Sequence, residues 1–466
     1  MTLVGVDAFR EPQSADARQR GEVLFERSRP RSRHAHWQSL GEDNQLFVVN
    51  GSRVFGVDAE VIAQLEAAAI SGDDAVRETL HRYGLLSPPL IDDQPLTSPP
   101  IHALSLAVAQ KCNLGCTYCY ASQGAFGSPA RNMTWEVAQR AVEFLIHSAE
   151  PGARLNLAFL GGEPLANRAV LRAATEHAEA LARENGMRLG FSITTNGTLV
   201  TEEDADFFER YGFAVTVSLD GLREEHDRQR PFKDGGGSFD RIMKRVQGLL
   251  SAQKRMQVSV RATVTPGNLR LKESLELFLG MGFHSVGFSP VLRSPTGNGE
   301  FGARDLAALL EAMVECGMEF ERRLLHGERY AFSNIVNALH EIHRGTHRPY
   351  PCGAGAGYFG VSAEGELAAC HRFVGDENGK MGTLTEGINR ERQNSWLAER
   401  HVHMQSPCRD CWARYLCSGG CHHEVISRGR IACDYIRGWL DYCLEAYARI
   451  SRFRSDWLAE GEAGAE

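Results

Sequence analysis

The sequence predicts an α/β protein built around a partial (β/α)6 barrel, and three observations support this fold. Apolar segments of strand length alternate with amphipathic segments of helix length between residues 101 and 300. Several of the expected strands end in small polar or glycine-rich residues, as in barrels whose binding site lies at the C-terminal ends of the strands. A cysteine-rich segment follows the first expected strand directly, at that same face.

The strands and helices of the barrel alternate regularly. Strands are expected at Leu104–Ala109, Leu155–Leu160, Leu189–Thr194, Ala214–Leu219, Gln257–Val264 and Ser285–Ser289. Helices are expected between them at Thr134–Ser148, Arg168–Glu184, Glu202–Tyr211, Phe239–Ser251 and Leu271–Gly280, and the helical segment Ala303–Leu325 follows. Because parallel strands must be joined by crossover connections, the alternation predicts a parallel sheet curled into a barrel.

The composition is that of a globular protein with several domains. The chain has 466 residues, of which 43% are hydrophobic and 24% charged. Its net charge of -8 argues against a nucleic-acid-binding surface, and no apolar segment is long enough for a membrane span or a signal peptide. We therefore expect a cytoplasmic protein, with neither nucleic acid nor membrane as a partner. In that compartment the 12 cysteines are better explained as metal ligands than as disulfides.

The N-terminal part predicts a small module ahead of the barrel. Residues 1–40 are polar and rich in arginine, which predicts a solvated arm. Residues 41–90 predict a β-hairpin over an Asn50–Gly51 turn and then two short helices, a winged-helix-like layout. This layout resembles the peptide-recognition element of many peptide-modifying enzymes, where a leader peptide adds a strand to the sheet edge. A simple cap on the barrel is the alternative.

The remaining boundaries follow changes in composition. A proline-rich linker is expected at 91–100, the barrel at 101–300, a helical bridge at 301–350, a cysteine-rich domain at 351–450 and a C-terminal tail at 451–466.

Three cysteines, Cys112, Cys116 and Cys119, form a CxxxCxxC motif on the loop after the first strand. Three thiolates on one short loop can bind three irons of a cubane iron–sulfur cluster and leave the fourth iron without a protein ligand. A structural zinc or cluster site would need four ligands nearby. Half of a zinc site, completed elsewhere in the chain, and disulfide bonding are the alternatives.

With Tyr118 between its second and third cysteines, this loop resembles the signature of radical S-adenosylmethionine (SAM) enzymes. The resemblance implies a [4Fe–4S] cluster whose open iron binds the amino and carboxylate groups of SAM. It also implies that reductive cleavage of SAM yields a 5′-deoxyadenosyl radical, which takes a hydrogen from the substrate.

Three motifs at later strand ends match the same family in order: GGEP at residues 161–164, TNG at 195–197 and SLDG at 218–221. The two glycines of GGEP would let the backbone approach a ligand closely, and Glu163 would accept from the SAM ammonium. The cofactor-binding residues that the resemblance implies are Tyr118, Gly161, Gly162, Glu163, Thr195, Asn196, Ser218 and Asp220. The following segment, Glu225–Pro231, also resembles the family; it is given no role, and a charged surface turn is the alternative.

The C-terminal cysteines resemble the SPASM extension of radical SAM enzymes, which holds two auxiliary [4Fe–4S] clusters, so three clusters are expected in all. The resemblance assigns Cys352, Cys370 and Cys421 to the first auxiliary cluster, and Cys408, Cys411, Cys417 and Cys433 to the second. A zinc ribbon is the alternative.

Two ligand positions stay open at this stage. Some relatives have an eighth cysteine just before the position of Cys352, and residues 347–351 contain none. The first auxiliary cluster could therefore keep an open iron for a substrate thiolate, or Cys316 could reach it, although a lone cysteine on an apolar helix is more often part of the core. In the second cluster, Cys443 could replace Cys433.

Residues 119–127 and 133–136 look like the thioether-forming peptide maturases, which include the maturases of SCIFF peptides and of quinohemoprotein amine dehydrogenase. This resemblance implies an enzyme that joins a cysteine sulfur to a carbon of Asp or Glu, while the surplus electron leaves through the auxiliary clusters. The favoured substrate is the small subunit of quinohemoprotein amine dehydrogenase with a leader sequence. A flavodoxin or ferredoxin is the expected electron donor.

Other products and one other class of function are alternatives. A Cys-to-Cα thioether, a carbon–carbon crosslink or a sulfatase-maturase-like oxidation would use the same parts, and a non-catalytic peptide escort would use only the N-terminal element. Sulfatase maturation is disfavoured because those relatives have an aspartate, proposed as the base, where this chain has His371. His371 is the one candidate for a catalytic base.

Overall fold

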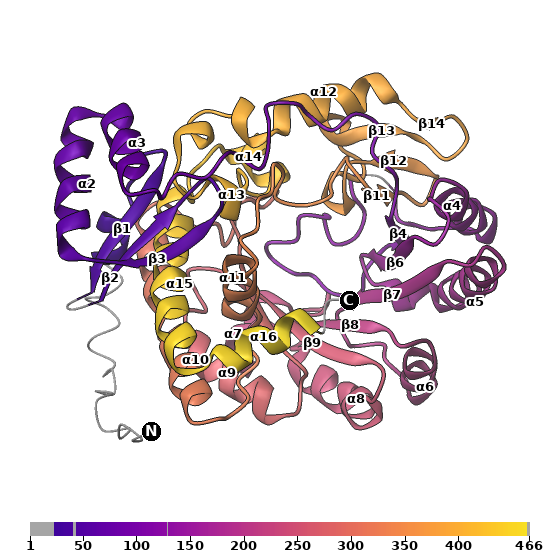
Figure 1. The fold of residues 1–466 in the computed structure, drawn as a ribbon. Helices are drawn as coiled ribbons and strands as arrows, with labels where there is room; N and C mark the ends of the chain where they lie inside the picture. Colours follow the sequence, from indigo (N-terminus) through magenta and orange to yellow (C-terminus); the bar gives the residue numbers. More distant parts are fainter. Residues whose placement is uncertain (1–22, 41–42, 128, 464–466) are drawn as a thin grey trace.

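The computed structural model describes residues 23–40, 43–127 and 129–463. Its centre is a row of parallel strands that lie side by side in chain order, as the sequence predicts (Figure 1). They are β4 (Ala103–Gln110), β6 (Arg154–Gly161), β7 (Arg188–Thr195), β8 (Ala214–Ser218), β9 (Gln257–Val264) and β10 (Val286–Pro290).

Helices cover one face of these strands. The helices expected between the strands are α4 (Trp135–His147), α5 (Arg168–Glu184), α6 (Glu202–Tyr211), α8 (Phe239–Ala252) and α9 (Leu271–Gly280). Strand residues that face them, such as Leu157 and Phe159, are fully buried. The opposite face, which we call the barrel lumen, carries small, partly accessible side chains such as Ser192 and Thr216.

The sheet continues past β4 into the cysteine-rich C-terminal part. Strand β11 (Tyr358–Val361) pairs in parallel with β4 on the side opposite β6, and β12 (Glu366–Ala368), β13 (Lys380–Thr383) and β14 (Gly387–Ile388) follow in antiparallel order. The sequence gives no sign of this extension, because β11 has 4 residues and β12 only 3, too few for a periodic pattern.

The N-terminal module is a three-stranded antiparallel sheet covered by two helices. Its elements are β1 (Ala35–Leu40), β2 (Asp43–Val48), β3 (Arg53–Val57), α2 (Ala59–Ser71) and α3 (Asp73–Arg82). The predicted hairpin is β2–β3, and Trp37, Leu46 and Leu65 belong to the module's own core.

Strand β1 corrects the expectation of a solvated arm over residues 1–40. Residues 1–22 lie outside the described part, but Ala35–Leu40 pair with β2 along their whole length. The pattern is concealed because the strand buries polar residues: His36 and Gln38 are each 2% exposed. A strand that buries polar side chains on one face has the same sequence pattern as a strand that exposes that face to solvent. The burial of both faces of β1 therefore cannot be predicted from its sequence.

Further helices lie in the C-terminal part of the chain. They are α10 (Asp305–Leu325), α11 (Ser333–His343), α15 (Cys433–Phe453) and α16 (Ser455–Ala463), so most of the expected tail from residue 451 is helical. The shorter elements are β5 (Arg131–Asn132), η2 (Pro164–Asn167), α7 (Arg223–Gln229), η3 (His371–Phe373), η4 (Glu377–Gly379), α12 (Arg390–Arg400), η5 (Val402–Met404), η6 (Cys408–Asp410), α13 (Arg414–Cys417) and α14 (His422–Arg428). Across the described residues, none of the helices has the length and apolar content that a membrane span requires.

Candidate active site

The cysteine loop leaves β4 at the C-terminal end of the sheet, where the sequence places it. Cys112, Cys116 and Cys119 are all partly buried. Backbone hydrogen bonds fix the loop to a neighbouring segment: the Gly115 N–H donates to the Pro231 carbonyl at 2.8 Å, and the Thr117 N–H donates to the Gln229 carbonyl at 3.0 Å. The loop is therefore held by the C-terminal end of α7 and the residues that follow it.

Tyr118 anchors this loop through a buried polar cluster. Its hydroxyl donates to the Asp220 carboxylate and accepts from Arg230 Nη1 at 2.6 Å. Tyr118, Asp220 and Arg230 are 9%, 0% and 8% exposed. Burial raises the pKa of Asp220, and the Arg230 guanidinium opposes this by stabilising the carboxylate. Two residues that the resemblance assigns to SAM thus contact each other across the loop.

The segment Glu225–Pro231 is not a charged surface turn, and that alternative is wrong. His226 is fully buried: its Nδ1 accepts from the Asp220 N–H at 3.2 Å, and its Nε2 lies 3.0 Å from Ser238 Oγ. Burial lowers the pKa of His226 to about 3, so the ring is neutral. His226 and Arg230 are four residues apart and share one face of the α7 turn, a spacing that could have revealed them.

The glycines of the GGEP motif make room for the protein's own backbone. A Cβ atom on Gly161 would lie 2.3 Å from the Ala109 carbonyl oxygen, and one on Gly162 would lie 2.3 Å from that of Lys111. The sequence predicts that these glycines let the backbone approach a ligand. In this structure they let it approach the backbone at the end of β4. The Gly162 and Glu163 N–H groups donate to those same carbonyls at 2.8 and 2.9 Å.

Glu163 joins the GGEP and TNG motifs. Its carboxylate is fully buried and accepts from the Thr195 hydroxyl at 2.8 Å, the Asn196 N–H at 2.7 Å and the Leu165 N–H at 3.0 Å. Burial raises the pKa of Glu163, and these three donors work against the rise.

The TNG motif in turn touches the cysteine loop. Asn196 Nδ2 donates to Asn113 Oδ1 at 2.9 Å and lies 3.6 Å from the Cys112 sulfur. Ser218, the last residue of β8, is partly accessible at the same edge of the sheet. The structure therefore gathers the predicted cofactor residues around one end of the barrel.

The donor chemistry of the loop fits an iron–sulfur cluster. Burial raises the pKa of Cys112, and it raises that of Cys116 to about 12, so metal binding must displace their protons. The neighbouring Arg230 favours the thiolate form of Cys116. Within the described ranges, His, Cys, Asp and Glu side chains form no group of three poised to hold a single metal ion. A cubane cluster does not need three side chains around one ion, because each thiolate binds a different iron of the cluster.

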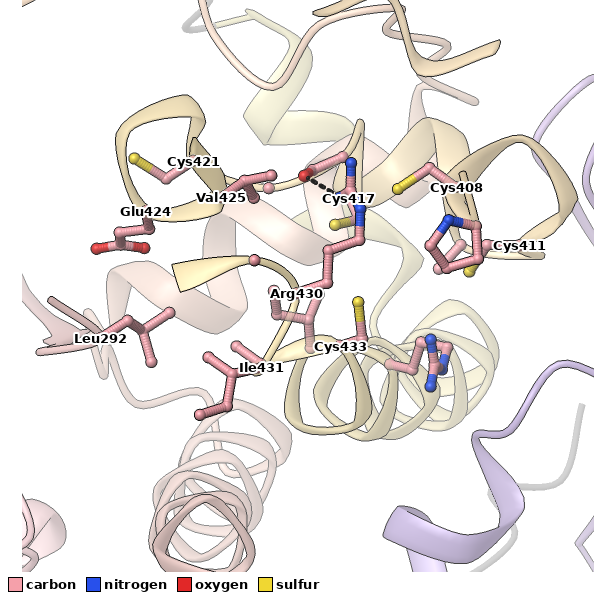
Figure 2. Close-up of a pocket in the computed structure, with 18 of the residues that line it drawn as sticks. Leu292, Cys408, Cys411, Cys417, Cys421, Glu424, Val425, Arg430, Ile431 and Cys433 are labelled. Atoms are coloured by element: carbon pink, nitrogen blue, oxygen red, sulfur yellow. Dashed lines mark hydrogen bonds between the residues drawn. The ribbon is translucent and has the colours of Figure 1, made fainter. Parts of the chain in front are cut away.

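The C-terminal cysteines form two groups. Electrostatic interactions link Cys370 to Cys352 and Cys421, whereas Cys417 interacts with Cys411, Cys408 and Cys433. Figure 2 shows the second group, with four sulfurs directed toward a shared space and Cys421 set apart from them. These groups match the two ligand sets that the resemblance implies.

Two other cysteines lie in the hydrophobic core. Cys443 is fully buried within α15 and interacts with Glu321 and Asp441. Cys316 is fully buried in α10, next to Tyr330 and Tyr435. The structure thus favours Cys433 over Cys443 in the second group, and it leaves Cys316 away from the first.

Aromatic side chains separate the cysteine loop from the first C-terminal group. Tyr120 follows Cys119, and its ring lies 6.0 Å from that of His371. His371 Nδ1 lies 2.8 Å from the Tyr358 hydroxyl. Burial, together with Arg372 and Arg261, lowers the pKa of His371 to about 4. The candidate base is therefore a neutral imidazole near neutral pH.

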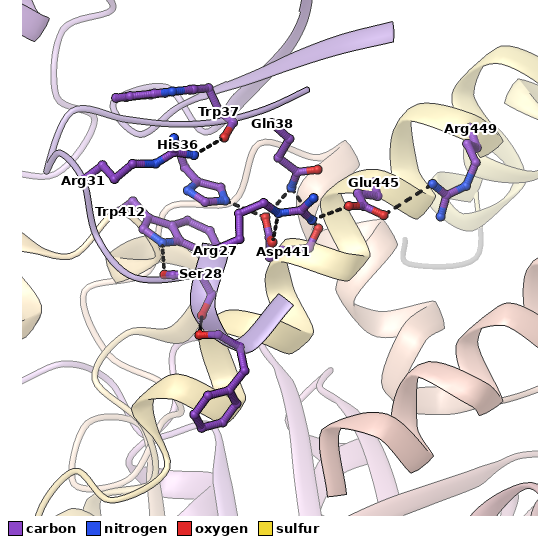
Figure 3. A network of polar contacts seen from close by, with 11 residues as sticks. Arg27, Ser28, Arg31, His36, Trp37, Gln38, Trp412, Asp441, Glu445 and Arg449 are labelled. Carbon is purple, nitrogen blue, oxygen red and sulfur yellow. Dashed lines mark hydrogen bonds and ion pairs between the residues drawn. The ribbon is translucent and has the colours of Figure 1, made fainter. Parts of the chain in front are cut away.

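The N-terminal module is joined to this C-terminal part by a buried polar network (Figure 3). Asp441 of α15 is fully buried and accepts from Arg27 Nε at 2.8 Å, from Gln38 and from His36 Nε2 at 2.5 Å. The His36 ring stacks on Trp412 with centroids 4.0 Å apart. Trp412 directly follows Cys411, so the module rests on the segment that carries the second cysteine group.

Comparison with known proteins agrees with this geometry. Residues 106–287 match the sequence model of the radical SAM superfamily. The chain is 26% identical over 376 residues to the serine-type anaerobic sulfatase-maturating enzyme of Bacteroides thetaiotaomicron, a match that covers 74% of this chain and 88% of that enzyme. It is 22% identical over 380 residues to the radical SAM cyclopropyl synthase TigE of Paramaledivibacter caminithermalis, covering 77% of each.

A solved structure has the same architecture. The structure described as native anSMEcpe with bound AdoMet superposes with a TM-score of 0.64 at 21% identity, over 76% of this chain and 99% of that chain. The fold is therefore the radical SAM fold, and the predicted fold class is confirmed. The matched segment, with the cysteine loop at the strand ends, is that of a radical SAM enzyme, whose cofactors are SAM and a [4Fe–4S] cluster.

Replacing Tyr118 by Phe should weaken the barrel cluster. The change removes the hydroxyl that joins Asp220 to Arg230, and loss of an outer-shell partner typically costs about 10- to 100-fold in metal affinity. We expect iron to be lost to a chelator at least about tenfold faster than from the wild type. Tyr211→Phe is the matched control, because its ring packs on Phe191 and Phe207 and its hydroxyl makes no hydrogen bond to the described residues. Equal rates for both variants would contradict the anchoring role.

Replacing Cys433 by Ser should lower the iron content, whereas replacing Cys443 by Ser should not. Loss of Cys433 should lower the iron bound per chain by up to about four, the content of one cubane cluster. Loss of Cys443 should leave it unchanged, because that thiol lies in the core. Iron and protein are quantified after anaerobic reconstitution, and a loss only in the Cys443 variant would reverse the assignment.

Replacing Asp441 by Asn should loosen the N-terminal module. The change removes the buried charge that accepts from Arg27, His36 and Gln38 and leaves Arg27 paired with Glu445 alone. Loss of such a buried partner costs about 3 kcal/mol, which corresponds to about a hundredfold faster opening. Hydrogen exchange of the β1 amides measures this opening. Asp456→Asn breaks a pair whose aspartate is 60% exposed and should change exchange less than about fivefold; similar behaviour of the two variants would argue against the network.

Proposed function

We propose that this enzyme forms thioether crosslinks between a cysteine sulfur and a carbon of Asp or Glu in a ribosomally made peptide or protein subunit. The observation that carries the proposal is the first C-terminal cysteine group, in which the described part of the chain brings together three cysteines, Cys352, Cys370 and Cys421. A cubane held by three protein thiolates keeps one iron open, and a substrate thiolate is the natural fourth ligand.

The position of this group supports the proposal. Tyr120 interacts with both Cys119 of the loop and Cys370 of the group. A peptide lying between them would have its hydrogen-bearing carbon near the SAM site and its thiol near the open iron. When bound, SAM and the loop cluster supply the radical that takes the hydrogen. The chain's own residues position the peptide, and the neutral His371 is available to accept the thiol proton as it leaves.

The cofactor residues have specific roles in this proposal. Cys112, Cys116 and Cys119 would hold the cluster that binds SAM, and the second C-terminal group would hold another auxiliary cluster, which makes three clusters in all. The auxiliary clusters would take up the one electron that is released when the thiolate sulfur bonds to the carbon radical. Glu163 and Asp220 support the SAM site by fixing the strand ends, and Asn196 and Ser218 line it. An electron donor of the flavodoxin or ferredoxin type supplies the reducing electron in the cytoplasm.

The substrate that we favour is the small subunit of quinohemoprotein amine dehydrogenase. The antiparallel sheet β1–β3 offers an edge to which a leader peptide can add a strand. A relative of this fold has been solved with a peptide bound, in the structure described as native anSMEcpe with bound AdoMet and Cp18Cys peptide.

A second candidate is the oxidation of a cysteine or serine side chain to an aldehyde, because the sulfatase-maturating enzymes are among the relatives. His371 disfavours it, since it replaces the aspartate proposed as the base in those enzymes. The two reactions give different products and can be separated by one experiment.

Coexpression with the amine dehydrogenase small subunit should give a product that has lost two hydrogens per crosslink and whose cysteines resist alkylation. Tandem mass spectrometry should place each lost pair on a Cys and an Asp or Glu. The Cys112→Ala/Cys116→Ala/Cys119→Ala variant is the control; it should give no product and bind about eight rather than about twelve irons. An aldehyde that reacts with a hydrazide would support the second candidate. A product without crosslinks, in which as many cysteines are alkylated as in the unmodified subunit, would contradict the first.

A further inference from the structure

The lumen of the barrel is lined almost entirely by small side chains. In β9 the residues Val258, Val260 and Ala262 are buried against the helices, so the alternate residues face the lumen. Toward the C-terminal ends of the central strands, the lumen-facing residues are Asn156, Ala158, Ser192, Thr194, Thr216, Ser218, Ser259, Arg261 and Thr263. Arg154 and Arg188 lie at the N-terminal ends of their strands. Arg261 is the charged residue of the C-terminal set, and it lies opposite Ser218 in the register of β8 and β9.

Arg261 has no protein partner for its charge. Among the described residues, no hydrogen bond or ion pair of its guanidinium is found, and the carboxylate that acts on it is already paired with another arginine. Glu424, which interacts with Arg261 electrostatically, is paired with Arg372 at 2.7 Å. Arg261 and Arg372 therefore share the single carboxylate of Glu424, which leaves one positive charge in this group without a counter-charge.

The environment of Arg261 is enclosed but open to solvent. Its side chain is exposed, yet burial, aided by the positive charge of Arg372, lowers its pKa. Arg261 is therefore reached by solvent although protein surrounds it, as expected for a side chain that lines an internal space. Guanidinium stays charged in proteins, and a charge held in such a space without a counter-charge is costly. An anionic ligand would remove that cost.

The space beside Arg261 lies between the two halves of the candidate site. Arg372, its neighbour in charge, lies 5.4 Å from the centroid of the Tyr120 ring, next to the cysteine loop. The same guanidinium lies 3.7 Å from the sulfur of Cys421, in the first C-terminal group. A ligand that binds Arg261 is therefore held between these two groups of cysteines.

We propose that Arg261 binds a substrate carboxylate in the barrel lumen and thereby selects an Asp or Glu residue for modification. This inference rests on the proposed function and names the chemical group that the site recognises. A planar guanidinium can bind a carboxylate through two parallel hydrogen bonds, which an amide of the same shape cannot match.

The test uses the reconstituted full-length enzyme with SAM bound and two small probes, N-acetylglutamate α-amide and N-acetylglutamine α-amide. Their affinities are measured by saturation-transfer NMR. The wild type should bind the carboxylate at least about tenfold more tightly than the amide. Arg261→Gln should abolish this preference, and Arg261→Lys should retain part of it. Arg188→Gln, which removes a charge at the opposite end of the barrel, should behave like the wild type.

Affinity for radiolabelled SAM is measured on the same variants. It should change less than about twofold in Arg261→Gln, because SAM is bound by other residues, and it also shows that the variant is folded. A drop of about tenfold or more in Arg261→Gln, with Arg261→Lys unaffected, would assign Arg261 to the carboxylate of SAM and overturn the proposal. A wild type that binds both probes equally, or binds neither, would overturn it as well.

The inference and the proposed function fail in different ways. If no thioether forms in coexpression but the carboxylate preference depends on Arg261, the site still recognises a carboxylate and only the product is wrong. If thioethers form but Arg261→Gln keeps the preference of the wild type, the product stands and this inference fails.

Discussion

The pairing of β11 with β4 is the constraint on which the arrangement of the site depends. Strand β4 is bonded in parallel on both sides, to β6 and to β11. Its C-terminal end leads into the cysteine loop, and the hairpin after β11 leads to Cys370 and His371. Through Gly360, Ala368 of β12 lies level with Ser105 of β4, so Cys370 lies toward the start of β4 whereas Cys112 lies beyond its end. At about 3.3 Å per residue, the length of β4 therefore sets the separation between two cysteine groups that are far apart in the sequence.

Buried carboxylates organise the same edge of the sheet. Glu163 accepts hydrogen bonds from the end of β7, and Asp220 accepts from Tyr118 and from the Thr263 N–H of β9 at 2.9 Å. Each carboxylate is completely buried, and its loss of solvent is offset by donors from neighbouring strand ends. Such satisfied buried groups rigidify a site, which suits a reaction in which a reactive radical must meet one carbon only.

Much of the fold could be predicted because the barrel elements are long and periodic. The helix Leu271–Gly280 and the strand Gln257–Val264 begin and end at the predicted residues. Prediction failed where a different physical factor decides the structure. Strand β1 buries polar residues against α15, and the charged segment at Glu225–Pro231 is buried because the cysteine loop packs on it.

Within the site, the residues that belong to sequence motifs could be predicted. Residues that reach the site only because of how the chain folds could not. Cys112, Glu163 and Asp220 occur in recognisable spacings. Arg261, by contrast, is one polar residue in an alternating strand, and the same pattern would arise if that face were open to water. That face is turned inward by the curvature of the sheet, which does not change the alternation of apolar and polar residues along a strand.

The contact between Gly162 and the Lys111 carbonyl has a mechanical consequence. With Gly124 on its other side, the backbone of residues 161–162 is held between β4 and the cysteine loop with no space for even a methyl group. The loop and the end of β6 must therefore move as one body. Any shift of the cysteine loop is therefore transmitted to the strand end that carries Glu163, so the two halves of the cofactor site keep their alignment.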